Sequence, residues 1–220
     1  MYKCLQNIHV GNSHLSSFDF QPIDQESMEP IRLWRNAQID ILRQKEPLTK
    51  EDQIRYFNNV LIPSFSQDHP SQILWQIKRS GTLIGYGGLV HIDWNDGKED
   101  GKAEISFLLD DAIHEGSVDF KEAFFAFVTF LKKIAFEGFK FRKLSAEIYH
   151  YRHLVIALLE HSGFMLEGTL QAQICKKGCW QDSLLYGLLR PQHGPNVLVT
   201  SISKKVPLLL TVKKAMKLCR

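Results

Sequence analysis

The sequence has few cysteines, no long apolar run and no large excess of charge of either sign. Its 220 residues include four cysteines, of which only Cys175 and Cys179 lie close together. A zinc site needs about four ligands, and no second cysteine–histidine pair has matching spacing, so we predict reduced thiols and no metal. No apolar stretch reaches the ~18 residues of a membrane span, and residues 1–11 lack a signal-peptide pattern. We therefore expect a cytoplasmic protein without membrane contact.

The charge balance argues against a nucleic-acid partner. The formal net charge is +3, with 44% hydrophobic and 23% charged residues, as in an ordinary globular domain. A dedicated nucleic-acid binder presents a concentrated basic face. Here the adjacent lysines are only short pairs, at 132–133, 176–177 and 204–205.

The hydrophobic pattern predicts helices and strands that alternate along the chain. Residues 1–17 fit either a short strand or a loose leader. Apolar residues recur at helical spacing from 29 to 42, from 50 onward, from 120 to 137 and from 154 to 161. Thr49 and Asp52 resemble a capping box at the start of the second helix, and Pro63 is expected to end it.

Shorter apolar runs predict a mixed sheet. Strands are expected at 73–77, 83–90, 103–109, 143–149, 164–174 and 180–188, with a hairpin turn between the first two. A strand, a helix and a strand follow one another from 103 to 149. This arrangement implies a parallel pair with a right-handed crossover. The predicted class is therefore α/β with a mixed sheet.

Five short motifs in this order resemble the GNAT superfamily of acetyl-CoA-dependent N-acyltransferases. They are Leu33-Trp34-Arg35-Asn36, the stretch 83–89, Glu104-Ile105-Ser106-Phe107, the stretch 158–164 with Glu167-Gly168, and the stretch 182–189. The resemblance covers residues 29–189 and implies a GNAT-type domain over 1–189. In that fold two parallel strands, here 104–109 and 144–149, splay apart and admit the arm of acetyl-CoA.

The resemblance also implies where the cofactor binds, and there the sequence departs from the family. The implied contacts are Phe107, Leu108, Leu109, Gly116, Ser117, Val118 and Lys121. The glycine pattern of the family's phosphate loop is not kept, and Glu115 and Asp119 bring two carboxylates toward the expected pyrophosphate. Three interpretations stay open: a divergent loop still offers N–H donors, the domain has lost cofactor binding, or the alignment is shifted by a few residues.

Acetyl transfer to an amine needs a path for the amine proton and donors for the developing oxyanion. The resemblance makes Glu104 a base or an amine-orienting group. A tyrosine that protonates the leaving thiolate in the family is replaced by Leu159, so Tyr149 and His150 are the predicted catalytic substitutes. An imidazole titrates near neutral pH, which suits a proton relay. The predicted acceptor contacts are Trp34, Arg35, Asn36 and His91.

The predicted function is direct transfer of an acetyl group from acetyl-CoA to a primary amine. The acceptor is expected to be an amino sugar nucleotide, an amino-acid-like metabolite or a protein N-terminus, and a homodimer is left open. The alternative is a non-catalytic GNAT-shaped scaffold in a ligase fusion, motivated by Glu115, Asp119 and Leu159.

The sequence pattern predicts that the C-terminal segment is not part of this domain. Residues 190–195 predict a linker. Residues 196–220 resemble the first strand and helix of a domain that precedes an ATP-grasp ligase, and a C-terminal extension packed on the same domain is the alternative.

Overall fold

A computed structural model describes residues 2–6, 8, 14–15, 17–94 and 101–191. The described residues form one unit, Met1–Arg190. A second unit, Pro191–Arg220, is described only at Pro191. The predicted strand and helix of the ligase-like segment, and most of the predicted linker, therefore lie outside the described residues.

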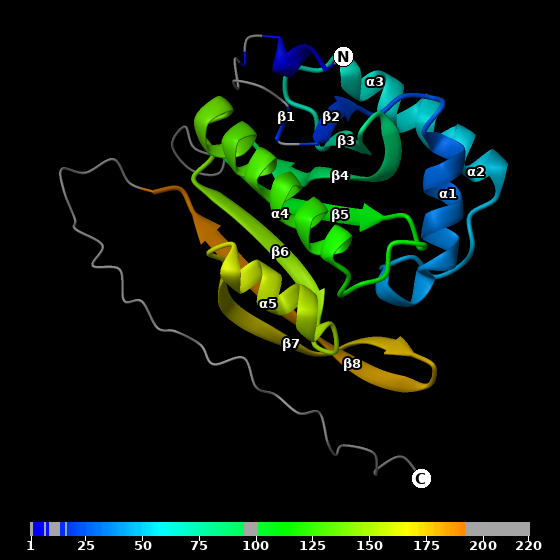
Figure 1. Cartoon of the computed structure of the whole chain (residues 1–220), viewed down its shortest axis with the longest axis vertical. Helices are drawn as coiled ribbons and strands as arrows, with labels where there is room; N and C mark the ends of the chain where they lie inside the picture. The colour runs from blue at the N-terminus through cyan, green and yellow to red at the C-terminus, as the bar shows by residue number, and fades with distance from the viewer. Residues whose placement is uncertain (1, 7, 9–13, 16, 95–100, 192–220) are drawn as a thin grey trace. The chain divides into compact units, whose positions relative to one another are not determined.

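The described part of the chain is organised around an 8-stranded mixed sheet, which confirms the predicted fold class (Figure 1). The strand order is β1-β2-β3-β4-β5-β6-β8-β7. Only β5 and β6 pair in parallel; the other neighbours are antiparallel. The strands are β1 (His14–Leu15), β2 (Phe18–Pro22), β3 (Ile73–Arg79), β4 (Thr82–Asp93), β5 (Lys102–Leu109), β6 (Lys143–Tyr149), β7 (Met165–Lys176) and β8 (Cys179–Leu189).

Strand β2 was not expected from the sequence. Its residues alternate between apolar and polar, with Phe18 and Phe20 buried in the core. The strand is short and ends at Pro22, which pairs with Trp75 of β3. The expected β3–β4 hairpin is present. Its two-residue turn, Ser80 and Gly81, has positive φ at both positions, which matches the twist of the flanking strands.

The helices agree with the predicted periodicity except near Pro63. They are α1 (Met28–Ala37), the 3-10 turn η2 (Ile39–Ile41), α2 (Lys50–Tyr56), the π-helical turn η3 (Phe57–Leu61), α3 (Ile62–Phe65), α4 (Val118–Lys132), the π-helical turn η4 (Lys133–Gly138) and α5 (His153–His161). A short 3-10 turn, η1 (Lys3–Leu5), precedes them. The capping box of Thr49 and Asp52 is confirmed.

The prediction that Pro63 ends the helix was wrong. The chain stays helical to Phe65 because η3 interrupts the regular hydrogen-bond pattern just before the proline. Pro63 then falls in the first turn of α3, where the missing N–H removes no α-helical hydrogen bond.

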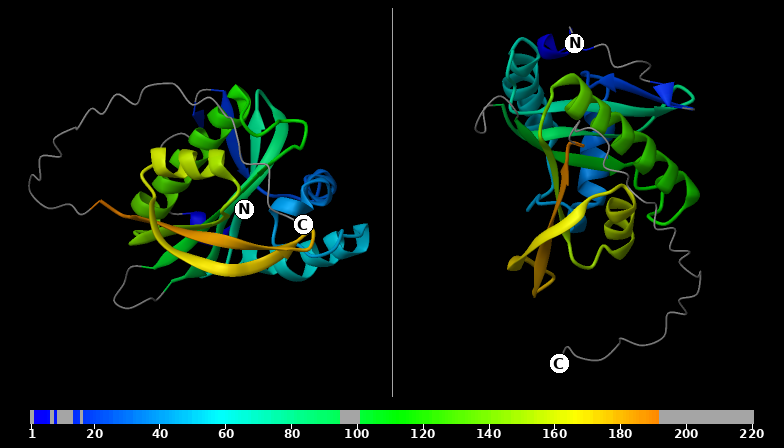
Figure 2. Two further views of the ribbon diagram at one scale, coloured as in Figure 1. Left: turned by 90° about the horizontal axis from the view of Figure 1, so that it is seen from below. Right: turned by 90° about the vertical axis from the view of Figure 1, so that its left-hand side faces the viewer.

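Helices cover both faces of the sheet, and the strands alternate between two apolar clusters (Figure 2). The larger cluster packs α4 and α5 on one face, and the smaller packs α1 and the 50–65 helical region on the other. Leu74 and Leu108 join the smaller cluster, whereas their neighbours Trp75 and Leu109 join the larger one. The period of two that defines a strand therefore places β3 and β5 between two helical layers.

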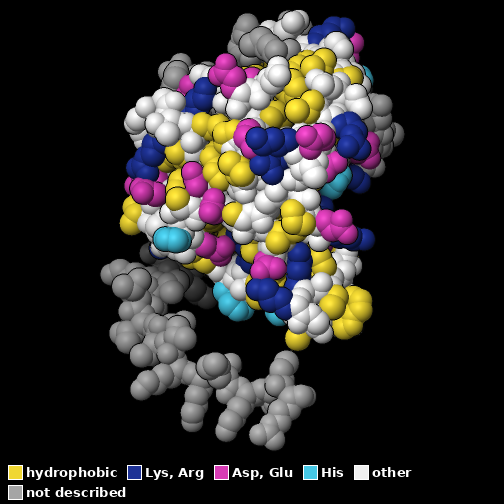
Figure 3. Space-filling view, turned by 90° about the vertical axis from the view of Figure 1, so that its right-hand side faces the viewer, with side chains coloured by type: hydrophobic (Ala, Val, Ile, Leu, Met, Phe, Trp, Pro, Cys, Tyr) yellow, Lys and Arg dark blue, Asp and Glu magenta, His cyan; other side chains and the backbone are white. Residues whose placement is uncertain are grey.

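The surface carries charges of both signs. On the face in Figure 3, acidic and basic side chains are intermixed over much of its extent. Among the helices of the described residues, none is both long and apolar enough to cross a membrane.

Candidate active site

A cavity of about 580 Å³ opens where β5 and β6 diverge. The two parallel strands pair at three positions only, the last being Glu104 with Ser145. Beyond that point, residues 105–107 of β5 and 146–149 of β6 line the cavity. On its outer sides β5 stays paired to β4 and β6 stays paired to β8. The predicted splay is therefore present, and the strand edges inside it face the cavity.

A charged cluster lies at the mouth of this cavity. A terminal nitrogen (Nη2) of Arg43 donates to Glu104 on β5 and to Glu147 on β6, each at 2.8 Å. Nδ1 of His91 lies 3.1 Å from the other oxygen of Glu104. A carboxylate oxygen accepts in such a contact, so the contact favours the His91 form that carries a proton on Nδ1. Arg43 joins β5 and β6 at the point where their backbones no longer pair.

His91 reaches the cavity because β4 is irregular there. The pairing with β5 shifts between Val90 and Asp93, and His91 has φ of 48°. Such a bulge turns a side chain away from the regular alternation of the strand. The predicted contact residue His91 therefore lies beside the predicted catalytic residue Glu104.

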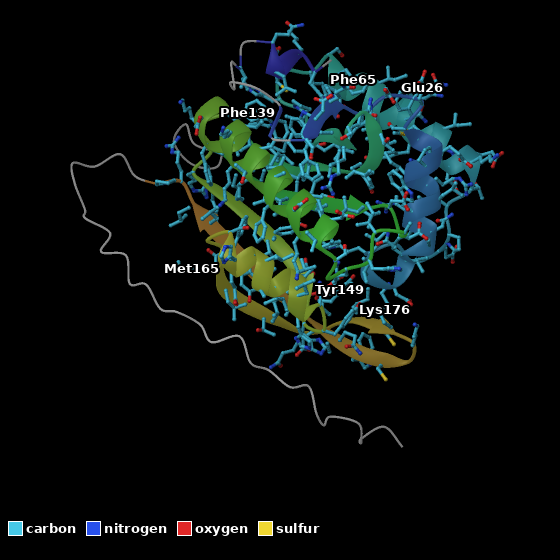
Figure 4. All side chains as sticks on the ribbon, viewed as in Figure 1. Glu26, Phe65, Phe139, Tyr149, Met165 and Lys176 are labelled. Atoms are coloured by element: carbon cyan, nitrogen blue, oxygen red, sulfur yellow. The ribbon has the colours of Figure 1, made fainter. Side chains whose placement is uncertain are left out.

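Tyr149 lies in the cavity wall with a buried hydroxyl that has no hydrogen-bond partner among the described residues. Figure 4 labels it where β6 runs into the turn before α5. Burial raises the pKa of Tyr149, so the phenol keeps its proton at neutral pH. The second predicted substitute, His150, is outside the cavity lining. Its backbone N–H donates to the carbonyl of Asp182 at 3.1 Å.

The two acidic residues at the start of α4, Glu115 in the preceding loop and Asp119 in the first turn, each pair with an arginine. Glu115 pairs with Arg152 at 2.8 Å, and Asp119 pairs with Arg79. Ser117 caps α4 by accepting the N–H of Phe120, and Gly116 has φ of 104°. The first N–H groups of a helix have no intrahelical partner and favour an anion. Val118 is 69% exposed at that end, and the half-buried Lys121 follows one turn later.

Of the three other predicted cofactor contacts, one lines the cavity and two have side chains buried in the apolar clusters. Phe107 lines the cavity and packs edge-on against Phe120 and Phe124. Leu108 and Leu109 are buried in the two apolar clusters on opposite faces of the sheet. Their backbone belongs to the splayed strand, whereas their side chains pack in the cores.

The three predicted acceptor residues on α1 have different environments. Trp34 is buried in the smaller cluster and is a packing residue. The side chain of Asn36 bonds the backbone N–H and C=O of Leu48, which fixes the loop between α1 and α2. Arg35 lines the cavity and donates to Tyr86 at 2.7 Å and to Gln44 at 3.0 Å.

Residues 39–43, which we call the strap, close one side of the cavity. Ile41, Leu42 and Arg43 contribute to its lining. The ammonium of Lys176, from the β7–β8 hairpin labelled in Figure 4, donates to the carbonyls of Ile39 and Leu42 at 2.8 and 3.0 Å. The hydroxyl of Tyr151 donates to the carbonyl of Asp40, whose carboxylate pairs with Lys177. The strap is therefore anchored to the far edge of the sheet.

The sequence-based prediction missed Arg43, Glu147 and Tyr56 as lining residues. Glu147 had a usable signal, since it lies two residues after the register partner of Glu104 on a parallel strand. Arg43 had none, because its two contacts span 61 and 104 residues of chain. The exposed thiols of Cys175 and Cys179 are not part of the cavity lining.

Comparisons with known proteins point to one family. The family profile described as acetyltransferase (GNAT) domain matches residues 21–185. No curated protein sequence matched. A crystal structure of spermidine N-acetyltransferase from Vibrio cholerae with CoA and spermine aligns at a TM-score of 0.68 and 14% identity, covering 80% of this chain and 97% of that one.

Two other solved structures have the same fold. A putative phosphinothricin N-acetyltransferase aligns at a TM-score of 0.63 and 18% identity, covering 80% of this chain and 100% of that chain. A dodecameric form of the Vibrio cholerae spermidine enzyme aligns at 0.64 and 17%, covering 80% and 95%. At these identities the likeness concerns the fold.

Proposed function

This chain belongs to the GNAT acetyltransferase family, and on that premise we propose that its cavity transfers an acetyl group from acetyl-CoA directly to a primary amine. The acceptor is an amino sugar nucleotide, an amino-acid-like metabolite or a protein N-terminus. The observation that carries the proposal is that Glu104, His91 and Tyr149 all line the opening between β5 and β6, with His91 against Glu104. A homodimer stays a prediction.

The residues present fit acetyl-CoA. The backbone edges of β5 and β6 are exposed to the cavity beyond Glu104, and α4 begins with a capped turn. Glu115 and Asp119, which motivated the scaffold alternative, each lie in an ion pair that offsets their repulsion of a pyrophosphate. Gly116, Ser117, Val118 and Lys121 would hold that end of the molecule. Acetyl-CoA supplies the activated acetyl thioester.

His91 and Glu104 are positioned to remove a proton from the amine. In this proposal Glu104 accepts from Nδ1 of His91, and Nε2 is the nitrogen that acts as the base. The His91 side chain is 67% exposed, whereas that of Glu104 is 20% exposed. In this assignment Glu104 orients the base, and Arg43 donates to the other oxygen of Glu104.

Tyr149 is positioned to return a proton to the departing thiolate. Its hydroxyl is buried in the wall of the splay and is uncommitted to any described residue. Because burial raises its pKa, the group stays protonated until it is needed as a donor. It thereby takes the role for which the sequence offers no tyrosine at position 159, where Leu159 contributes apolar lining.

Titration calorimetry with acetyl-CoA, followed by CoA release with a panel of amines, tests the proposal. We expect micromolar binding, turnover, and a loss of roughly 100-fold in kcat for His91→Gln. The matched control is His69→Gln, because His69 is exposed and outside the cavity lining. A folded protein that neither binds acetyl-CoA nor releases CoA with any amine would overturn the proposed function.

A further inference from the structure

Arg35 stands between the main cavity and a side chamber of about 260 Å³. It lines both, as do Tyr56, Gln72, Val90 and Ser106. The side chamber extends under α1, where its wall is mostly apolar. An acceptor whose amine lies near His91 could therefore extend past Arg35 into this chamber.

Arg35 keeps a cationic charge that no described carboxylate neutralises. Its Nε donates to the amide oxygen of Gln44 and one terminal nitrogen donates to the hydroxyl of Tyr86, both uncharged groups. No ion pair of Arg35 occurs within residues 2–6, 8, 14–15, 17–94 and 101–191. A guanidinium has five N–H donors in a fixed plane, and these two contacts use two of them. The remaining donors suit a planar or tetrahedral oxyanion.

The other charges around the cavity are already paired. Arg43 contacts both glutamates of the lining, Glu104 and Glu147, so one cation there faces two carboxylates. Arg152 is held by Glu115. In the side chamber the carboxylate of Asp52 accepts from Thr49 in the capping box and pairs with Arg55. The main cavity lining therefore has one carboxylate in excess at the Arg43 cluster and one arginine, Arg35, without a carboxylate partner among the described residues.

We infer that the amine acceptor carries an anionic group, a carboxylate or a phosphate, which Arg35 binds through two parallel N–H···O contacts. A polyamine places further cations beside Arg35, which no described carboxylate neutralises, whereas an amine that also carries an anion places the opposite charge there. The inference rests on the proposed function and narrows the acceptor to an amine that also carries an anionic group. Such an acceptor differs from spermidine, the substrate named for the structural neighbour.

Four candidate amine acceptors that differ mainly in charge test whether the acceptor carries an anionic group. They are β-alanine, 2-aminoethyl phosphate, propylamine and spermidine, each assayed by CoA release at matched concentration. We expect kcat/KM to be about 10- to 100-fold higher for one or both anionic probes than for propylamine, as for a hydrogen-bonded charge pair. The two anionic arms distinguish a carboxylate from a phosphate.

Two substitutions of Arg35 connect that preference to the residue. Arg35→Gln should raise KM for the preferred anionic probe by the same factor and so lower the ratio of its kcat/KM to that of propylamine. Arg35→Lys should retain part of the preference, because it keeps the charge without the planar fork. The control for loss of a surface cation is Lys45→Gln, since Lys45 is exposed and lines neither space. Thermal unfolding of each variant shows that it is folded.

Calorimetry of the same probes with CoA-saturated protein gives a readout that needs no turnover. Equal kcat/KM for propylamine or spermidine, or an unchanged preference in Arg35→Gln, overturns the anionic class while the proposed function stands. Binding of an anionic probe that depends on Arg35 without any turnover supports the anion site and overturns the proposed function. If no probe is bound or acetylated, both fail.

Discussion

Replacing Tyr149 by phenylalanine should separate catalysis from stability. The hydroxyl of Tyr149 is buried without a described partner, and a buried polar group in that condition costs about 1–3 kcal/mol of folding free energy. Tyr149→Phe removes this cost and leaves the ring in place. We therefore expect the free energy of unfolding to stay equal or to rise by about 1 kcal/mol, which raises Tm by roughly 2–4 °C in a domain of this size.

Activity should change in the opposite direction. A positioned general acid contributes about 100- to 10,000-fold in rate, so kcat for CoA release with a good amine acceptor should fall by at least about 100-fold. The affinity for acetyl-CoA, measured by calorimetry, should change by less than about threefold, because the hydroxyl is proposed to act on the departing thiolate.

Tyr186→Phe is the matched control. The Tyr186 hydroxyl donates to Glu160 at 2.9 Å, and Tyr186 is outside the cavity lining. Removing that bond should lower stability by about 0.5–1.5 kcal/mol with kcat unchanged. Unchanged kcat in Tyr149→Phe would refute the catalytic assignment. A loss of stability as large as that of Tyr186→Phe would refute the description of an unpartnered hydroxyl.

Three further changes have defined outcomes. Glu115→Gln should lower the Kd for acetyl-CoA about fivefold in calorimetry, roughly 1 kcal/mol, because it removes a carboxylate near the proposed pyrophosphate position; Glu122→Gln should not, and an equal effect of both would argue against that position. Burial raises the pKa of Tyr2 to about 12, so the native state binds this proton more tightly than the unfolded chain. The contribution of Tyr2 to the free energy of unfolding is therefore complete below pH 10 and is lost as the pH rises toward 12. Urea unfolding at a series of pH values should show this loss. The loss should be smaller in Tyr2→Phe. Gly87→Ala should lower Tm by about 4–8 °C, since a Cβ would meet the β5 backbone and a core ring, whereas Gly168→Ala, in open space, should not; equal shifts would contradict this packing.

Most of the fold could be predicted because its elements carry strong local periodicity. The run around Phe127 and Leu131 follows the helical period and forms α4, and residues 143–149 form β6 as expected. The segment Phe18–Pro22 alternates with period two, which was a usable strand signal, yet it is short and ends in proline. Its place beside β3 is a long-range pairing that the local sequence does not encode.

The site could be predicted only where a motif carried it. Glu104 lies in such a motif, and the structure places it in the lining of one cavity with His91 and Tyr149, which lie outside the five motifs. The arginines that pair with the acidic residues of the site could not be predicted from a motif. Arg43 reaches Glu104 and Glu147 only after the strap has folded across the sheet. Likewise the sequence shows Glu115 as an isolated acid, and only the fold brings Arg152 to it.

The anchoring of the strap makes the acceptor side of the cavity dependent on a hairpin that contributes nothing to its lining. Lys176 holds two carbonyls of the strap from 137 and 134 residues away in the chain. A substitution at the hairpin tip therefore shifts the wall against which an amine must fit. An engineer who wishes to alter acceptor choice should include positions 151, 176 and 177 in a library, because these residues of the last third of the domain hold the strap, which comes from the first third.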